Sequence, residues 1–306
     1  MSCTSSPIFE RAYRHKSLPQ GFSQGHDTTG VLGAASVIRP GNVLISAVAV
    51  LIGAVVGAGI GILWPLSVTL LLAAIVAALF TAAGNALNDY FDAETDARNH
   101  PERPIPRGLL TRTGALQVSA VLFALAVGLA LFLNLESFVI VLANLAVMVS
   151  YEARFKARGG SGNLLIAYLV GSLFLFAGTA TWGGDAAALS RAAVLALLAS
   201  LATLGREIVK DIEDVSGDVD RRTLPKTLGA ARAGRLASVA FGFAAGLSVL
   251  PFLLGILPLV YLALVLAADA IFIYCALFPT RTERHIGRVS KYGMVLALVA
   301  FLAGAL

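Results

Sequence analysis

Long stretches without a single charged side chain constrain the fold of this chain more than any other feature. Residues 63–87 and 114–135 contain no Asp, Glu, Lys or Arg. A helix of about 20 apolar residues crosses a hydrocarbon core of about 30 Å. Only 13% of the 306 residues are charged, whereas a soluble domain has about a quarter. The sequence therefore predicts an all-α, polytopic membrane protein surrounded by membrane lipids.

Turn residues and charges divide the apolar part of the chain into nine predicted spans. With the N-terminus in the cytoplasm, 22 of the 23 lysines and arginines lie on the cytoplasmic side, and only Arg191 lies outside. This distribution satisfies the positive-inside rule. The basic excess is thus a signal of topology, and we expect no nucleic acid as a partner. The predicted spans are residues 43–63, 66–88, 114–133, 137–152, 163–182, 192–213, 233–253, 256–278 and 288–305.

The N-terminal residues 1–35 are polar and lack the apolar core of a signal peptide. We interpret them as a cytoplasmic leader. Residues 36–306 are predicted to form a single transmembrane domain in the cell membrane, with its long charged loops in the cytoplasm. Cys3 and Cys275 lie far apart in the chain, and they indicate neither a disulfide framework nor a thiolate metal site.

Two acidic clusters interrupt the apolar pattern. Asp89, Asp92 and Asp96 lie at positions i, i+3 and i+7 within the stretch NDYFDAETD, and DIEDVSGD repeats this spacing further along the chain. At 3.6 residues per turn, each trio falls on one helix face. Both clusters close an even-numbered span on the predicted cytoplasmic side, so they can face each other. The repetition suggests an internal repeat of four-helix units. The second trio is Asp211, Asp214 and Asp218.

The composition of the clusters indicates a metal-assisted phosphate site. Solvated charge at a helix end would explain one trio, but two identical trios at membrane level favour a site, because such charges are costly there. Carboxylates without His or Cys suit a hard cation, Mg²⁺ above all. Because Mg²⁺ completes its shell with water and substrate phosphate, we expect a diphosphate clamp. A diphosphate beside apolar helices predicts a prenyl diphosphate as the substrate.

These motifs resemble those of a known family. NDYFDAETD resembles the NDxxDxxxD motif of the UbiA superfamily of membrane prenyltransferases, and DIEDVSGD its DxxDxxxD partner. IRPGN at residues 38–42 resembles the opening helix of the family, and YEARFK at 151–156 its Tyr-x4-Lys element. The resemblance implies about nine helices around a central cavity, with cytoplasmic cap loops and Mg²⁺ as the cofactor. It assigns metal binding to Asn88, Asp89, Asp92, Asp96, Asp211, Asp214 and Asp218, and catalysis to Asp92, Asp96, Asp214, Asp218, Tyr151 and Lys156.

Several basic and polar residues near the clusters have two interpretations. Arg39 and Asn42 are either substrate contacts or a snorkelling arginine and a helix cap. Tyr151 and Lys156 lie near the diphosphate in the family, but they also fit an interfacial aromatic and an inside charge. Asp269, in the middle of the eighth span, is either functional or hydrogen-bonded to a neighbouring helix. A phosphate-binding lid is expected from the basic loops, with Arg103, Arg107, Arg222 and Lys226 as its candidates.

The subfamily resemblance refines the function. REIVKDIEDVSGD followed by TLPKTLG is most similar to the enzymes that transfer geranylgeranyl to the free hydroxyl of geranylgeranylglyceryl phosphate in archaeal ether-lipid synthesis. The acceptor phosphate then needs a second basic contact, for which Arg39, Lys156 or the loop before the ninth span qualifies. Two alternatives stay open: transfer to an aromatic acceptor such as 4-hydroxybenzoate or a quinone precursor, and, from another class, a cation transporter with the aspartates as its ion path.

Overall fold

The computed structural model describes residues 33, 35–59, 61, 67–156, 158–181, 183–215, 222–281 and 285–306. Within these ranges, nine helices are long and apolar enough to cross a membrane, which confirms the predicted number of spans. The helices are α2 (Pro40–Ala58), α3 (Ser67–Asn99), α4 (Arg112–Ala130), α5 (Leu135–Ser150), the π-helical turn η2 (Tyr151–Phe155), α6 (Gly160–Ala180), α7 (Ala186–Glu213), α8 (Leu224–Leu228), α9 (Ala230–Leu247), α10 (Leu250–Leu253), α11 (Leu259–Leu277) and α12 (Ile286–Ala305).

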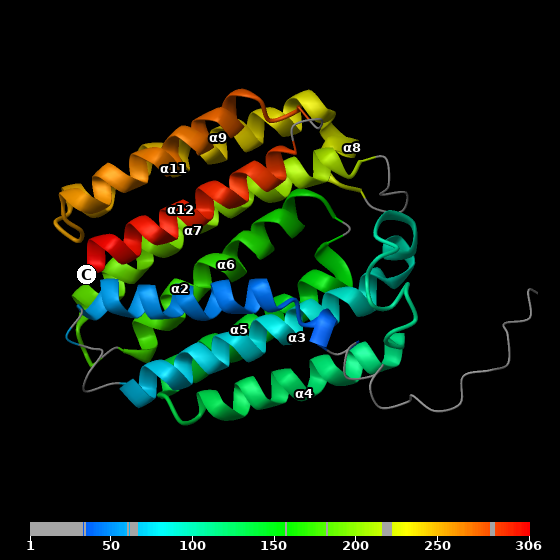
Figure 1. Ribbon diagram of the computed structural model, residues 1–306, viewed down its shortest axis with the longest axis horizontal. Coiled ribbons are helices and arrows are strands. Elements are labelled where there is room, and N and C mark those ends of the chain that lie inside the picture. The colour runs from blue at the N-terminus through cyan, green and yellow to red at the C-terminus, as the bar shows by residue number, and fades with distance from the viewer. Residues whose placement is uncertain are drawn as a thin grey trace, which may run out of the picture.

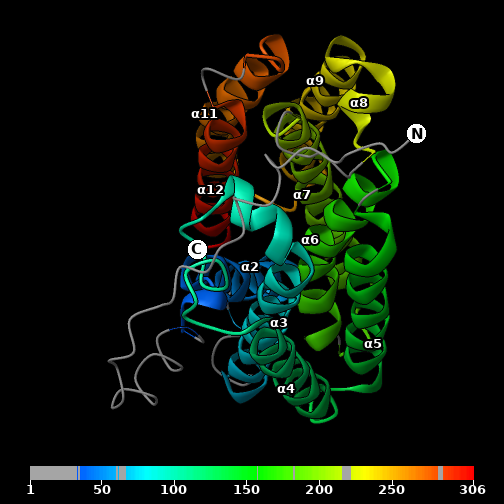
Figure 2. The ribbon, with the colours of Figure 1, turned by 90° about the vertical axis from the view of Figure 1, so that its right-hand side faces the viewer.

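The long helices lie side by side and close into a ring (Figure 1, Figure 2). From α2 to α7 each helix packs on the next, α7 packs on α9, α9 on α11 and α11 on α12. The last helix, α12, packs back on α2. Because α2 also contacts α6 and α7, it reaches into the interior of the bundle. The helices therefore surround a common interior space.

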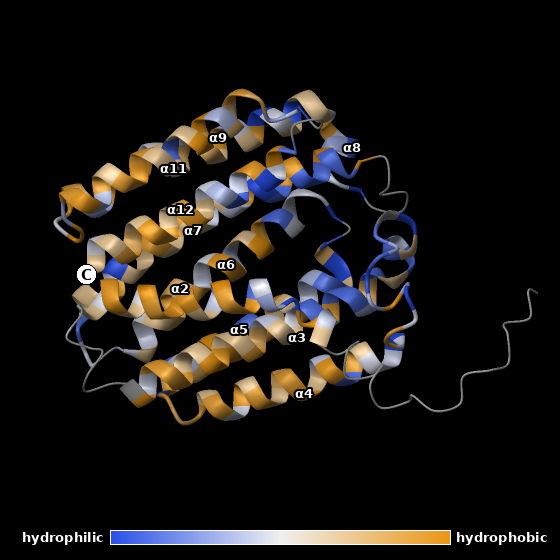
Figure 3. Ribbon diagram, in the orientation of Figure 1, coloured by the Kyte–Doolittle hydropathy of each residue, from blue (hydrophilic) through white to orange (hydrophobic). Residues whose placement is uncertain are grey.

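Polar residues gather at one end of this bundle. Figure 3 shows hydrophilic residues at the C-terminal ends of α3 and α7 and in the connections near them, whereas the rest of each helix is mostly apolar. We call this end of the bundle the motif end. The connections at the opposite end are short, such as the one between α4 and α5.

The helix α3 differs from its predicted span. The apolar run indicated an end at residue 88, but α3 has 33 residues and continues to Asn99. The first acidic cluster therefore belongs to the same continuous helix as the apolar span, and its trio keeps the predicted common face. A helix can extend past the apolar run here because Asp89, Asp92 and Asp96 each find a cationic or buried polar environment at the motif end.

Candidate active site

The first acidic cluster is buried at the motif end. The exposed fractions of Asp89, Asp92 and Asp96 are only 2%, 7% and 3%, so these side chains are not solvated charges at a helix end. Unpaired carboxylates at such burial would cost several kcal/mol each, on the order of the effective desolvation penalty of an ion. Cations must therefore hold them.

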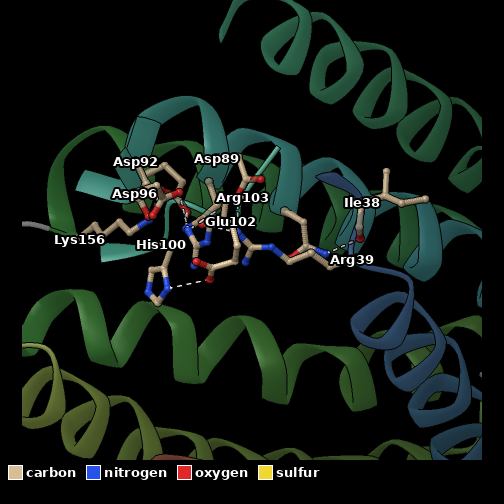
Figure 4. A network of polar contacts seen from close by, with 12 residues as sticks. Ile38, Arg39, Asp89, Asp92, Asp96, His100, Glu102, Arg103 and Lys156 are labelled. Carbon is tan, nitrogen blue, oxygen red and sulfur yellow. Dashed lines mark hydrogen bonds and ion pairs between the residues drawn. The ribbon is translucent and has the colours of Figure 1, made fainter. Parts of the chain in front are cut away.

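Three basic residues from three different segments supply those cations (Figure 4). Arg39, just before α2, forms an ion pair with Asp89. Arg103, in the connection after α3, lies 2.6 Å from Asp96 between Nη1 and Oδ2. Lys156 reaches Asp92 with 2.7 Å between Nζ and Oδ2. The structure thus brings together three of the predicted metal ligands and three of the predicted basic residues.

Glu152 is a member of this network that the sequence analysis missed. It is buried, with 7% exposed, and its Oε2 lies 2.8 Å from the Lys156 ammonium. Its Oε1 accepts a hydrogen bond of 3.0 Å from the side-chain amide of Asn88. The sequence signal that could have identified Glu152 is its i, i+4 spacing from Lys156, because residues at this spacing are neighbours on a helix surface. Lys156 therefore bridges two buried carboxylates.

The backbone at Arg39 adopts an unusual conformation. Its φ of 52° places it in the left-handed region, which is uncommon for a residue with a side chain and more so before a proline. Contacts with α3 hold the segment in place: the Arg39 guanidinium donates to Asn88 Oδ1 at 3.1 Å, and Asn85 donates to the Ile38 carbonyl at 2.8 Å. Residues kept in such regions concentrate at functional sites.

The π-helical turn η2 positions the Tyr-x4-Lys element. The Lys156 N–H donates to the Tyr151 carbonyl at 2.8 Å, five residues back. Single π-turns occur frequently at functional sites. Tyr151 lines the central cavity, and the Lys156 Nζ lies 5.7 Å from the centre of the Tyr151 ring.

Two residues of the second acidic cluster, Asp211 and Asp214, lie among the described residues. Asp211, half-buried near the end of α7, accepts a hydrogen bond of 3.0 Å from Asn163 on α6. Asp214 follows the last helical residue of α7 and is exposed. Tyr151 lies within electrostatic reach of both Asp92 and Asp211, which indicates that the two clusters border one region. Asp218 lies outside the described residues.

A cavity of about 430 Å³ extends from this region into the bundle. Arg39, Asn42 and Asn88 form part of its wall at the motif end, whereas Phe80, Leu173, Phe174 and other apolar side chains line its deeper part. The cavity therefore combines a polar end with an apolar body, as a substrate with an anionic head and a hydrocarbon tail requires.

Of the predicted site residues, Arg39, Asn42, Asn88 and Tyr151 line this cavity, whereas the other described ones do not. Arg107 is exposed in the connection after α3, Arg222 is exposed before α8, and Lys226 is exposed on α8. A role for them in a lid stays a prediction.

In the same connection as Arg107, Glu102 lies 3.3 Å from His100. A backbone hydrogen bond lowers the pKa of the Glu102 carboxyl, and the charge of His100 adds to the effect.

Asp269 joins two helices and also borders the cavity. Ser248, just after α9, donates a hydrogen bond of 2.7 Å to Asp269 Oδ2 on α11. The predicted hydrogen bond to a neighbouring helix is therefore present. The Tyr261 hydroxyl donates to the Ser248 carbonyl at 2.6 Å, so a small polar group lies among the apolar lining residues.

The donor set fits Mg²⁺ that is shared with a phosphate ligand. The Oδ2 atom of Asp89 is buried and has no hydrogen-bond partner among the described residues, so it is available to a cation. In the same part of the chain, no three Asp, Glu, His or Cys side chains converge tightly enough to hold a metal alone. Mg²⁺ typically takes one or two carboxylates and completes its shell with water and substrate phosphate, which is consistent with both observations.

Comparison with known proteins agrees with this geometry. The description of the UbiA prenyltransferase family matches residues 46–303. A relative from Natronomonas pharaonis, named digeranylgeranylglyceryl phosphate synthase, is 42% identical over 90% of this chain and 98% of its own.

Solved structures share the fold. One, described as giving insights into digeranylgeranylglyceryl phosphate synthase in membranes, has a TM-score of 0.73 and 32% identity over 90% of this chain and 98% of its own. A UbiA homologue from Archaeoglobus fulgidus bound to GPP and Mg²⁺ has a TM-score of 0.55 and 17% identity, and covers 89% of this chain and 99% of its own.

The family match spans most of the nine helices and the first acidic cluster, and extends across the second. It favours a transferase over the cation transporter that the aspartates alone left open. This chain belongs to the UbiA prenyltransferase family.

Proposed function

We propose that this protein is a Mg²⁺-dependent prenyltransferase that transfers geranylgeranyl from its diphosphate to the free hydroxyl of geranylgeranylglyceryl phosphate, in archaeal ether-lipid synthesis. The observation that carries the proposal is a cavity with an apolar body, whose polar end includes Arg39, the ion-pair partner of the buried Asp89. The archaeal relative named digeranylgeranylglyceryl phosphate synthase, 42% identical, supports this choice of acceptor.

The acidic face would hold the diphosphate of the donor through the metal. Asn88, Asp89 and Asp92 on α3, together with Asp211 on α7, would hold Mg²⁺, which offsets the negative charge that develops on the departing diphosphate. Arg39 lies between Asp89 and the cavity, so its guanidinium can donate directly to phosphate oxygens.

The walls of the cavity determine what happens to the prenyl group. As the bond between C1 and the diphosphate oxygen breaks, positive charge develops on the allylic carbons. Phe80, Leu169 and Leu173 line the cavity beyond the polar end and keep water from the cation. The acceptor hydroxyl then forms the ether bond to C1, and its proton passes to the released diphosphate.

The motif end is proposed to face the cytoplasm, because almost all lysines and arginines lie at that end of their spans. Residues 36–306 are proposed to act as one catalytic domain. The predicted leader, residues 1–35, lies outside the described residues except for Gly33 and Ala35, and the internal repeat of four-helix units stays a prediction.

The proposal is tested by incubating the purified protein with radiolabelled geranylgeranyl diphosphate, Mg²⁺ and a set of acceptors. We expect transfer to geranylgeranylglyceryl phosphate, loss of transfer with EDTA and its return with excess Mg²⁺. Transfer to 4-hydroxybenzoate instead would favour the aromatic alternative. Transfer that persists in EDTA would contradict the role of the metal, and folded protein without any transfer would overturn the proposal.

A further inference from the structure

A second group of charged side chains borders the same cavity, on the side of α7 and α12. Arg206 and Lys210 of α7 and Lys291 of α12 line the cavity wall together with one carboxylate, Glu207. Arg206 and Lys210 both contact this carboxylate, at 2.6 Å and 3.0 Å. These cations belong to α7 and α12, whereas the acidic trio belongs to α3. The cationic wall is therefore distinct from the acidic face.

The charges of this wall are not balanced by the residues that line it. Glu207 pairs with Arg206 and Lys210, and Glu152 and Asp269 also line the cavity, but no carboxylate among the described residues forms an ion pair with Lys291. Arg206 and Lys291 lie close enough for their charges to repel each other. The Nε atom of Arg206 is also buried without a hydrogen-bond partner in the described part of the chain. An anion at this wall would relieve the repulsion and satisfy the free donor.

Topology alone does not explain these positions. Arg206 precedes the end of α7 at Glu213 by seven residues, which places it roughly 10 Å inside the helix terminus at 1.5 Å per residue. A snorkelling cation would direct its charge to the membrane surface. Instead, all three cations border the cavity, with Arg206 and Lys210 half-buried and Lys291 exposed.

The two sides of the cavity suit two different phosphates. The acidic face on α3 needs a divalent cation before it can accept a diphosphate. The wall of Arg206, Lys210 and Lys291 offers a guanidinium fork and two ammonium groups, which bind a phosphate without any metal.

We propose that Arg206, Lys210 and Lys291 bind the phosphate of the acceptor, and that they thereby orient its free hydroxyl toward the region of Tyr151 between the two acidic clusters. This inference rests on the proposed function, since it names the contact through which that acceptor is recognised. A phosphorylated acceptor is preferred over the neutral alcohol because only the phosphate complements the cationic wall.

The first test compares Lys291→Gln with Arg288→Gln, which removes a charge from the same helix outside the cavity wall. Lys291 is suited to this test because no described carboxylate depends on it. We expect Lys291→Gln to raise KM for geranylgeranylglyceryl phosphate by about tenfold or more, the effect of losing one charge-assisted hydrogen bond. We expect two quantities to stay within about twofold of wild type: KM for geranylgeranyl diphosphate, and the rate with the unphosphorylated geranylgeranylglycerol. A twofold change corresponds to a free-energy difference well under 1 kcal/mol. Arg288→Gln should change none of them.

A second measurement follows binding without turnover. In EDTA, geranylgeranylglyceryl phosphate should raise the Tm of the wild-type protein and of Arg288→Gln, but not that of Lys291→Gln. Geranylgeranyl diphosphate should raise Tm only when Mg²⁺ is present. Equal increases in KM for donor and acceptor would assign the wall to the donor and overturn the inference. A Lys291→Gln protein with an unchanged KM for geranylgeranylglyceryl phosphate would also overturn it. Wild-type protein that does not use the phosphorylated acceptor would instead contradict the proposed function, while the Tm measurement would still decide whether the wall binds a phosphate.

Discussion

Lys156 pairs with two carboxylates that are buried within a bundle of apolar helices. Its ammonium lies 2.7 Å from Asp92 and 2.8 Å from Glu152. In the same way, Arg39 forms an ion pair with Asp89, and Arg103 forms one with Asp96. The four acids outnumber the three cations, so the cluster retains a negative charge. An excess of this sign favours a divalent cation and disfavours a free anion, which is why the acidic face needs a metal to bind a diphosphate.

Replacing Asp92 with Ala should separate function from folding. We expect the transfer rate to fall by about 10²-fold or more, the size of effect seen when a group that stabilises developing charge is lost. The protein should remain folded, because Lys156 keeps Glu152 as a partner. Transfer assays and thermal unfolding in detergent measure the two quantities.

The control is Glu94→Ala on the same helix. Glu94 is exposed and pairs with Arg112 at 3.4 Å, and surface pairs contribute little to stability. Both rate and Tm should therefore match wild type. An Asp92→Ala protein with a wild-type rate would refute the clamp, and one that fails to fold would show that Asp92 is structural.

Among the helices, α6 and α7 form the closest neighbours in the centre of the bundle. A methyl group added to Gly171 of α6 would lie 2.6 Å from the Ala196 carbonyl oxygen on α7. Small residues permit this approach of two backbones, which is how helices associate in membranes. Because α6 carries Asn163 and α7 carries Asp211, Arg206 and Lys210, the packing of this pair also positions both halves of the site.

Gly171→Ala should therefore lower the Tm in detergent, since the backbone of α7 must move to accommodate the methyl group. The matched control is Gly128→Ala in α4, where an added Cβ meets nothing within 4 Å. There, the helix propensity of alanine should stabilise the protein by roughly 0.5–1 kcal/mol. A Gly171→Ala protein at least as stable as Gly128→Ala would show that close packing of α6 on α7 does not stabilise the bundle.

For the molecule as a whole, the sequence predicted the spans better than it predicted the site. Uncharged runs, and a distribution of lysines and arginines from which Arg191 alone departs, were sufficient to predict nine helices. A bilayer imposes a length and a charge bias on every span. Periodicity also placed Asp89, Asp92 and Asp96 on one face. It could not identify the cations that pair with them, since the approach of Arg39 and Lys156 to α3 depends on tertiary packing.

Two details of the site depend on local structure and packing that the sequence did not predict. The Tyr-x4-Lys element begins with a π-helical turn at Tyr151, and nothing in YEARFK distinguishes it from an α-helix. The contribution of Lys291 to the cavity wall depends on the position of α12 beside α7. The family resemblance pointed to the same cavity. It did not indicate which cations on the side of α7 and α12 would lack a carboxylate partner among the described residues.

The orientation of the bundle can be measured by cysteine labelling in sealed cells. In a Cys3→Ser, Cys275→Ala background, Leu254→Cys should react with a membrane-impermeant maleimide, because the exposed Leu254 lies at the end opposite the motif end. Glu102→Cys should react only after permeabilisation, since the connection after α3 is predicted to be cytoplasmic. The opposite pattern would invert the topology, and with it the side from which both substrates enter.

The account depends most on the claim that both acidic clusters serve one site. The two halves are Asp92 on α3 and Asp211 on α7, with Tyr151 in electrostatic reach of both. If they hold one metal–diphosphate assembly, either loss already removes most of the stabilisation of the transition state, and residues that act as a unit are strongly non-additive.

The decisive measurement is the transfer rate of Asp92→Asn, Asp211→Asn and the double variant, with folding verified by thermal unfolding. We predict that each single variant keeps a measurable residual rate and that the double variant loses far less than the product of the two single losses. Losses that multiply would mean two independent charged patches, and the shared site would be wrong.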